Sequence, residues 1–509
     1  MSYYLGLDCG GTLIKAGIYD ETGHEYAVAR SALDTISRQP GWQERNLANL
    51  WHHAAAVIHK AIASSGLPAC AISGVGISAQ GKGVYLLDRQ GQVLRDGILS
   101  SDQRALDIVR TWQQDGIPEQ LYPHTLQTLW TGHPVSLLRW LKLNEPGTWA
   151  QIGHVLMAHD YLRFCLTGQI ACEETNISES NLFNMQTGRY DPALAALLGI
   201  EEIMDRLPPV IGATDIAGTV TAQAAALTGL AVGTPVVGGL FDVVSTALCA
   251  GIVDETRLNA VMGTWSVTSG ITRQIKTHPT QRFVHGRHAV PGQYIVHAAS
   301  PTSAANLEWV SRNMGATSAA PDHASINAAI AALPKAHSSV QFLPFLFGSN
   351  AGLGMKSGFY GLQAAHEPAH LLQAVYEGVV FSHYSHLLQM RECFSTVEAL
   401  RVTGGPARSE VWMQMLSDMS GLPVEIPAVE ETGCLGAALA TAVGLGVHAD
   451  FQSAVLATAT PLTVIHADPT ARDAYQHKYQ RYQRLIECLR QFEEVPAQAL
   501  PPFLPGAPA

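Results

Sequence analysis

The chain opens with short apolar runs separated by turn residues. The first two runs, Tyr4–Leu7 and Leu13–Tyr19, flank a Gly-Gly-Thr sequence, and a turn at Glu21–Gly23 precedes a third run. Apolar runs bounded by glycine-containing turns are typical of β-strands. Over Leu47–Ile62 the apolar spacing changes to that of an amphipathic helix. The pattern therefore predicts an α/β protein that begins with a strand meander.

The same pattern returns in the middle of the chain. Residues 258–272 again form an apolar run, a Gly-Thr turn and a second apolar run, and a long helix is predicted near Ala369–Met390. Two halves that open alike indicate a duplicated α/β domain with a cleft between the copies. We expect an N-terminal domain, a C-terminal domain and a closing helix with a Pro-rich tail, at residues 1–250, 251–448 and 449–509.

Composition narrows the class of protein. With 509 residues the chain is too long for one hydrophobic core, and its 47% hydrophobic and 14% charged residues are typical of a globular enzyme. A net charge of -11 argues against a nucleic-acid partner. The eight cysteines form no C-x-x-C pair and are expected to be reduced.

The charge-free stretch Ala224–Leu240 is expected to form buried strand and turn, not a membrane span. A strand from the third residue leaves no room for a signal peptide, so we expect a cytoplasmic protein; a homodimer is left open.

Two Gly-Thr turns are candidates for phosphate binding. Glycines at Gly11 and Gly263 let backbone amides approach phosphate oxygens, and the hydroxyls of Thr12 and Thr264 add donors. Asp8 in the first turn can hold Mg²⁺, whereas Ala260 occupies the equivalent position before the second. An ordinary hairpin turn also favours Gly and Asp. Two phosphate turns with one carboxylate suit a single triphosphate, ATP with Mg²⁺.

Asp242 follows a buried apolar strand and precedes a predicted helix. One interpretation is a helix N-cap, for which Asp is preferred. The other is a catalytic base kept ionised by the helix amides, which accepts the proton of a hydroxyl group. The two interpretations are compatible.

Two further loops carry candidate binding residues. The strand–turn–helix at Gly404, Gly405 and Ala407 offers a flat backbone surface for adenosine, although such turns are common in α/β proteins. Gln80, Lys82 and Asp102 follow strand-like segments, where substrates often bind. The alternative for these residues is a solvated loop.

From about Tyr3 to Gly446 the sequence resembles the FGGY carbohydrate kinases. The positions that match the C-terminal signature of that family are Ser357, Phe359, Gly361, Leu362, His370, Leu371, Ala374, Val375, Tyr376 and Glu377. The N-terminal signature is matched in part, because Leu137 stands where the family usually has Lys. The resemblance implies two actin-like (ribonuclease H-like) ATPase domains, with ATP and a sugar in the cleft between them.

The resemblance also implies a role for each candidate residue. Asp242 would be the base and would contact the sugar; Asp8 would serve the metal. The turns at Gly11, Thr12, Gly263 and Thr264 would hold phosphates, and Gly404, Gly405 and Ala407 would hold adenosine. A catalytically inactive sugar sensor is the other class of function, and the presence of both Asp8 and Asp242 argues against it.

Gly81 and Lys82 follow Gln80, where other FGGY subfamilies have different pairs, and Ser100 replaces a usual Trp. In these features the chain is similar to the L-xylulose kinases. That similarity implies transfer of phosphate from ATP to the terminal hydroxyl of a ketopentose, L-xylulose first. Another ketose, a polyol or a keto-sugar acid (L-ribulose, xylitol or 3-keto-L-gulonate) is the alternative, since Lys82 could neutralise an acid group.

Overall fold

The computed structural model describes residues 2–263, 265–278, 282–314, 322–352, 355–458 and 461–494. The chain divides into two compact units. Unit 1 comprises Met1–Asn259, Ser269–His297 and Pro427–Pro461; unit 2 comprises Ala260–Thr268, Ala298–Ile426 and Leu462–Ala509. Each unit is built from three separate segments of the chain. The domain boundaries at residues 250 and 448 therefore stay a prediction. Thr264 and the Pro-rich tail lie outside the described residues.

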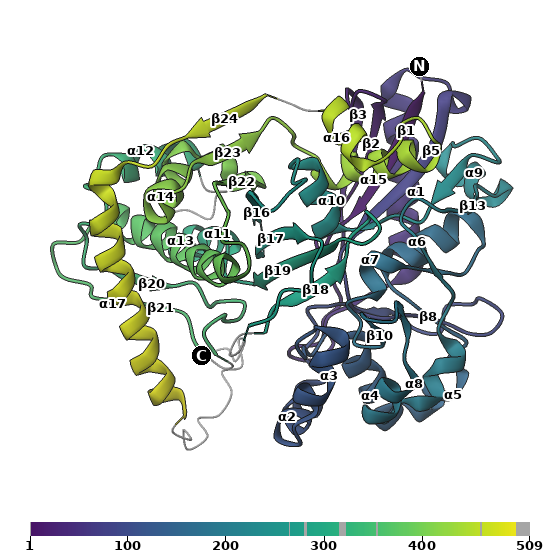
Figure 1. Ribbon diagram of the computed structural model, residues 1–509, viewed down its shortest axis with the longest axis horizontal. Helices are drawn as coiled ribbons and strands as arrows, with labels where there is room; N and C mark the ends of the chain where they lie inside the picture. Colours follow the sequence, from purple (N-terminus) through teal and green to yellow (C-terminus); the bar gives the residue numbers. More distant parts are fainter. Residues whose placement is uncertain are drawn as a thin grey trace, which may run out of the picture. The chain divides into compact units, whose positions relative to one another are not determined.

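The first sheet lies wholly in unit 1, with the strand order β13-β14-β5-β1-β2-β3 (Figure 1). Its edge strand β13 is Ile216–Thr219. The central strand β1 (Tyr3–Cys9) pairs antiparallel with β2 (Leu13–Asp20) and parallel with β5 (Ile72–Ala79). The meander continues into β3 (Glu25–Ala32). The predicted opening strands are therefore present. The short strand β15 (Leu240–Phe241) pairs with the carboxyl end of β5, which brings the start of the next helix to that edge.

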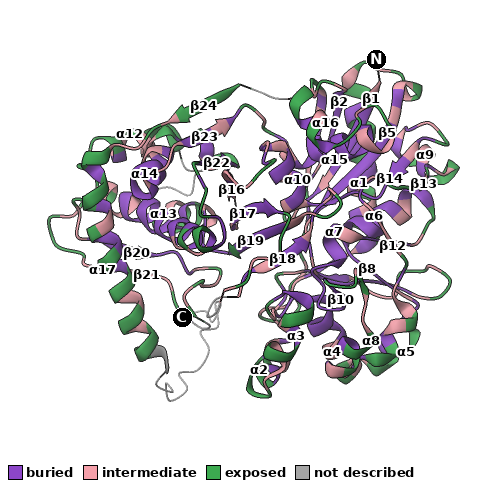
Figure 2. Ribbon diagram, viewed as in Figure 1, coloured by how far each residue is buried: buried purple, intermediate pink, exposed green. Residues whose placement is uncertain are grey.

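Helices cover both faces of this sheet. Leu5 and Leu7 of β1 share a core with α1 (Leu47–Ser65), whereas Tyr4 shares a core with α15 (Thr432–Gly444). Alternate residues of a strand point to opposite faces, so α1 and α15 lie on opposite sides of β1. Asn46 caps α1 by accepting from the amide of Asn49. Figure 2 shows the sheet buried between its helices.

A methyl group on Gly6 of β1 would lie 1.8 Å from the carbonyl oxygen of Cys434, and one on Gly76 of β5 would lie 2.2 Å from that of Ala437. Both distances are far below van der Waals contact, so only glycine admits α15 this close to the sheet.

The second sheet has the strand order β18-β19-β17-β16-β22-β23-β24, in which β19 is Tyr294–Ser300 and β24 is Leu462–Ile465. Its strands are divided between the units: β18 (Val284–Arg287) belongs to unit 1, and β22 and β24 belong to unit 2. The long helix predicted near Ala369–Met390 is confirmed as α13 (Pro368–Cys393). It packs against α14 (Glu410–Ser420), and α14 packs against α17 (Pro469–Glu494). Strand β22 (Ala399–Thr403) runs parallel to β23 (Val424–Pro427) and leads into the predicted adenosine loop. The second Gly-Thr turn joins β16 (Arg257–Met262) to β17 (Ser266–Thr272).

One predicted stretch differs from the structure. Ala224–Leu240 was expected to form only strand and turn, but it begins within a helix, α9 (Ala222–Thr228). The Thr221 hydroxyl accepts from the amide of Ala224 at the start of α9, and Gly229 ends it in the left-handed region (φ 76°). Strand β14 (Pro235–Val237) then follows as expected. Of the helices in the described ranges, none is sufficiently long and apolar to span a bilayer.

Candidate active site

Asp8 lies near the carboxyl end of β1, in register with Lys15 of β2 and Ser78 of β5. Its carboxylate contacts the first turn of α15, since a methyl group on Gly433 would lie 2.2 Å from Cγ of Asp8. Burial raises the pKa of Asp8 to about 6, although the Lys15 ammonium opposes the shift. The carboxylate therefore occupies a narrow space in which only glycine fits opposite it.

Gly11 and Thr12 of the turn beside Asp8 are exposed. The Gly10 amide donates to Leu13 O (2.9 Å), and Nη2 of Arg45 donates to Gly11 O (2.6 Å). Within the described part of the chain, the amides of Gly11 and Thr12 donate no hydrogen bond. Two unused amides next to a carboxylate are a donor set that suits a phosphate and its divalent cation.

Asp242 is the first residue of α10 (Asp242–Cys249), and Phe241 occupies the N-cap position. Burial and the nearby Asp8 carboxylate raise the pKa of Asp242 to about 7, against smaller opposing effects of the Val243 amide and Lys82. The sequence predicted a carboxylate kept ionised by the helix amides. Desolvation outweighs those amides in the structure, so Asp242 titrates near neutrality. A pKa of about 7 suits a general base that works at neutral pH.

Lys82, one of the predicted substrate residues, lies in a three-residue ion-pair network. Its Nζ is 2.7 Å from Oε2 of Glu179, and Nε2 of His297 donates to Oε1 of the same carboxylate (2.8 Å). Burial alone would raise the pKa of Glu179, but its contacts with His297 and Lys82 outweigh burial and hold the pKa well below its usual range. The Lys82 ammonium also lies 5.5 Å from the centre of the Phe241 ring, next to Asp242. It is therefore not a solvated surface lysine.

The short helix α7 (Glu174–Ile177) holds the backbone on both sides of this network. The hydroxyl of Thr175 accepts from the amide of Phe241 (2.9 Å), immediately before Asp242. The side-chain oxygen of Asn176 lies 3.4 Å from the amide of Lys82, a residue with a φ of 65°. One element thus fixes the Gln80–Lys82 loop and the start of α10.

The sequence interpretation missed Glu179, His297 and Asn176. Residues 176–181 are almost fully buried although five of the six are polar. A run of polar residues predicts a solvated loop. No periodicity in the sequence distinguishes such a loop from a buried polar segment. Only the folded chain brings Glu179 next to a lysine 97 positions away.

Asp102 is fully buried in a different network. Its carboxylate accepts from the Gln43 amide (2.6 Å) and from Nε of Arg104 (2.9 Å), whose guanidinium stacks on Trp42 (4.0 Å). Arg104 also contacts Glu44 (2.8 Å). Contact between Asp102 and a substrate stays a prediction. For such a contact, the carboxylate would have to give up its hydrogen bond with Gln43 or Arg104.

In unit 2 the predicted adenosine loop adjoins the predicted phosphate turn. Gly404 has a φ of 100°, and a methyl group there would lie 2.2 Å from the carbonyl oxygen of Met262, the residue before Gly263. Gly404 and Gly405 are exposed, and the Ala407 amide donates to Gly404 O (3.1 Å) in a 3₁₀ turn. Two backbone segments thus meet at one edge of the unit.

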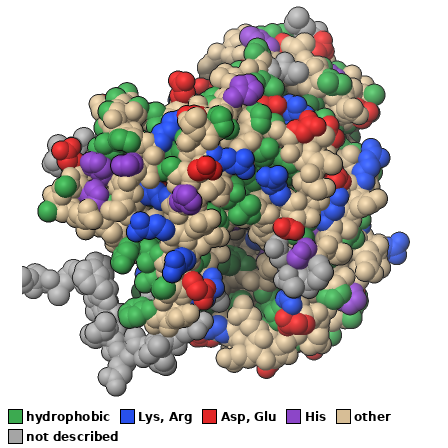
Figure 3. Space-filling model, turned by 60° about the vertical axis from the view of Figure 1, so that its left-hand side comes forward, with side chains coloured by type: hydrophobic (Ala, Val, Ile, Leu, Met, Phe, Trp, Pro, Cys, Tyr) green, Lys and Arg blue, Asp and Glu red, His purple; other side chains and the backbone are tan. Residues whose placement is uncertain are grey.

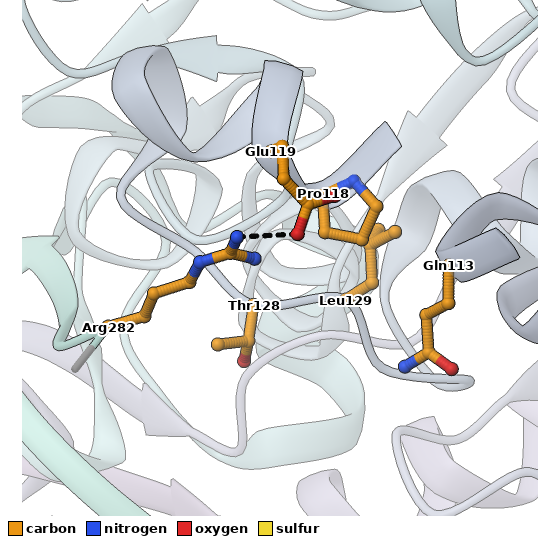
Figure 4. Close-up of a pocket in the computed structure, with 6 residues that line it drawn as sticks. All are labelled: Gln113, Pro118, Glu119, Thr128, Leu129 and Arg282. Atoms are coloured by element: carbon orange, nitrogen blue, oxygen red, sulfur yellow. Dashed lines mark hydrogen bonds and ion pairs between the residues drawn. The ribbon is translucent and has the colours of Figure 1, made fainter. Parts of the chain in front are cut away.

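A separate surface pocket of about 270 Å³ is shown in Figure 4. It is lined by residues of unit 1, where Arg282 contacts Glu119 at 2.6 Å. The Arg282 side chain is half-buried and that of Glu119 is exposed. None of the predicted site residues lines it. On the face drawn in Figure 3, basic and acidic side chains are interspersed among neutral ones.

The chain is similar to known proteins over nearly its whole length. The N-terminal domain of the FGGY family of carbohydrate kinases matches residues 3–249, and its C-terminal domain matches residues 258–445. The chain belongs to the FGGY family of carbohydrate kinases. This kinase is therefore a phosphotransferase with an alcohol group as acceptor, and the family implies ATP as the phosphoryl donor.

Several relatives resemble this kinase over nearly its whole length. The L-xylulose/3-keto-L-gulonate kinase of Escherichia coli (strain K12) is 61% identical, with 96% of this chain and 98% of that protein covered. A probable L-xylulose kinase of Pasteurella multocida is 58% identical, over 96% and 99%. The crystal structure of xylulose kinase from Rhodospirillum rubrum is similar at 28% identity with a TM-score of 0.85, over 96% and 99%. The predicted two-domain α/β kinase fold is confirmed.

Proposed function

We propose that this kinase transfers the terminal phosphoryl group of ATP to the terminal hydroxyl of L-xylulose, giving L-xylulose 5-phosphate. The observation that carries the proposal is the 61% identity, over nearly full length, with a kinase named for L-xylulose. The reaction is a displacement at phosphorus, so the protein must mainly position the two substrates and stabilise the charge on the moving phosphoryl group.

Asp242 is proposed as the base that accepts the proton of the attacking hydroxyl. Its raised pKa and its place at the edge of the first sheet, next to Lys82 and the Gln80 loop, support this role. Gln80, Lys82 and Asp102 are proposed to contact the sugar. Since both Gln80 and the start of α10 are held by α7, the acceptor and its base would be positioned by the same element.

Asp8 is proposed to bind Mg²⁺, which supplies positive charge to the phosphate oxygens. The carboxylate lies beside the unused amides of Gly11 and Thr12, and these amides would hold phosphate. Gly263 and Thr264 would form the second phosphate turn. The exposed backbone at Gly404 and Gly405, with Ala407, would hold adenosine. An Mg²⁺ ion bound through one carboxylate and the substrate phosphates is the usual arrangement in nucleotide sites.

A keto-sugar acid is the second candidate acceptor, because the Escherichia coli relative is named for 3-keto-L-gulonate as well. L-ribulose and xylitol remain alternatives from the sequence. We further propose that the enzyme works in the cytoplasm, which fits its eight free cysteines, and that it has no nucleic-acid partner.

A panel assay tests the proposal. ADP release is measured with L-xylulose, 3-keto-L-gulonate, L-ribulose, D-xylulose and xylitol, in the presence and absence of Mg²⁺. We expect the highest kcat/KM with L-xylulose and no turnover without a divalent cation. A higher kcat/KM for a polyol or another ketopentose would contradict the proposed substrate, and metal-independent turnover would remove Mg²⁺ from the mechanism.

A further inference from the structure

The ion pair of Lys82 and Glu179 lies next to Asp242, where the acceptor must bind if the proposed function holds. Of its members Lys82 is the more accessible, with 18% of its side chain exposed against 1% for Glu179. A substrate therefore meets the ammonium group first, and the carboxylate lies behind it. The net charge that a bound acceptor faces at Lys82 therefore depends on whether Glu179 is ionised beside it.

Glu179 is fixed in this position by its surroundings. One carboxylate oxygen binds Lys82, and the other binds His297. On a third side, a methyl group at Gly286 of β18 (Val284–Arg287) would lie 2.5 Å from Oε1 of Glu179, so the neighbouring strand is in close contact. With both oxygens bound and no space to turn, the carboxylate cannot leave Lys82 without breaking two charged contacts.

The two candidate acceptors differ in charge. L-xylulose is neutral, whereas 3-keto-L-gulonate carries a carboxylate. A lysine without a counter-ion would attract the sugar acid, and a lysine paired with a buried carboxylate offers almost no net charge. We infer that Glu179 is a specificity-determining residue of the acceptor site: it cancels the charge of Lys82 and so favours an uncharged ketose over a sugar acid. The inference rests on the proposed function.

Glu179→Gln tests the inference, because it keeps the size of the side chain and removes the charge. The quantity measured is the ratio of kcat/KM for 3-keto-L-gulonate to kcat/KM for L-xylulose. Any general effect on Asp242 or on ATP binding alters both values and cancels in the ratio. We expect the ratio to rise by about tenfold or more in Glu179→Gln. In Lys82→Gln the ammonium is lost while the Glu179 carboxylate stays, so the site should repel the acid and the ratio should fall by a similar factor.

Two controls separate charge from damage. Glu174→Gln removes one negative charge from the same segment, at a carboxylate that is 37% exposed and 3.6 Å from Arg287, and it should leave the ratio within about twofold of wild type. The double variant Lys82→Gln/Glu179→Gln removes both charges and should return the ratio toward wild type.

If Glu179→Gln does not fold, Lys82→Gln still tests the sign of the effect. Ratios that stay within about twofold of wild type in the folded single variants would overturn the inference and leave the proposed function intact. A wild-type enzyme that phosphorylates neither compound would overturn both.

Discussion

At Asp242, burial and the nearby Asp8 carboxylate both oppose ionisation. The raised pKa has a consequence for stability. Between about pH 4 and pH 7 the folded protein binds this proton more tightly than the unfolded chain does, so the contribution of Asp242 to stability falls as the pH rises through this window. The residue therefore lowers the stability of the folded enzyme at the pH at which it can act as a base.

Asp242→Asn should lower kcat by roughly 10²–10⁴, because an amide cannot accept the hydroxyl proton. If Asp242 were an N-cap, as one interpretation of the sequence holds, Asn could still cap the helix and stability would fall by less than about 1 kcal/mol. The structure predicts the opposite: a gain of about 1–3 kcal/mol at pH 8 that disappears near pH 4. Denaturant unfolding of both proteins at the two pH values, without nucleotide or metal, measures this gain. A variant that is less stable at pH 8, with activity lost only in proportion to the unfolded fraction, would show that Asp242 is structural.

The pH profile of the wild-type enzyme is a second expectation at this scale. A base must be ionised before it can accept a proton, so kcat/KM for the sugar should fall about tenfold per pH unit below about pH 7 and reach a plateau above it. Rates at saturating Mg-ATP between pH 5 and pH 9 provide the measurement. A flat profile down to pH 5 would assign the base to a group with an ordinary carboxylate pKa.

At the scale of elements, the contact of α15 with β1 positions the proposed metal ligand. Gly433→Ala would place a methyl group 2.2 Å from Cγ of Asp8, so the Asp8 side chain must move. We expect kcat/KM to fall by about 100-fold while stability falls by about 1–3 kcal/mol, since a side chain and not the backbone gives way.

Two other glycines serve as comparisons for Gly433→Ala. Gly6→Ala meets the backbone of Cys434 at 1.8 Å and should destabilise by about 3 kcal/mol or more. Gly147→Ala, in α5 (Pro146–Gln151), has no atom within 4 Å and should be nearly neutral. Full activity of Gly433→Ala would show that the present position of Asp8 is not required.

The elements that the sequence predicted correctly have local signals. The opening strands are bounded by glycine turns, and α13 begins at a proline, which is favoured at the first helical position. Helix α9 was missed because an alanine-rich stretch without charge resembles a buried strand. At the site, Asp8 and the turns could be named from motifs. The partners of Lys82 could not, because a contact between residues 97 positions apart has no local signature.

At the scale of the whole molecule, α17 packs against α14 within unit 2 although the two helices are about 50 residues apart in sequence. Helix α17 places Lys478 against Glu377 of α13, and both are buried. Burial raises the pKa of Glu377 even opposite this lysine. Glu377, which matches the C-terminal signature of the family, thus has an ion-pair partner 101 residues away.

Lys478→Met should destabilise unit 2 by about 3–5 kcal/mol, because it leaves a buried carboxylate without a counter-ion. An unpaired buried carboxyl group takes up a proton more readily, so the loss should be larger at pH 8 than at pH 6. Denaturant unfolding at both pH values is the measurement. Lys478→Met/Glu377→Leu should recover most of the loss; a double variant as unstable as the single one would assign the effect to packing instead of charge.

The interleaving of the two units also affects how the protein is made. Strand β1 leaves the ribosome well before α15, which covers it and follows after about 420 further residues. At roughly 5–20 residues per second, synthesis of that length takes on the order of tens of seconds. During this interval the glycine-lined face of the first sheet has no cover. The nascent chain should therefore depend on chaperones that shield apolar surface, and a fragment that stops before α15 should aggregate even though it contains every residue of the proposed acceptor site up to Asp242.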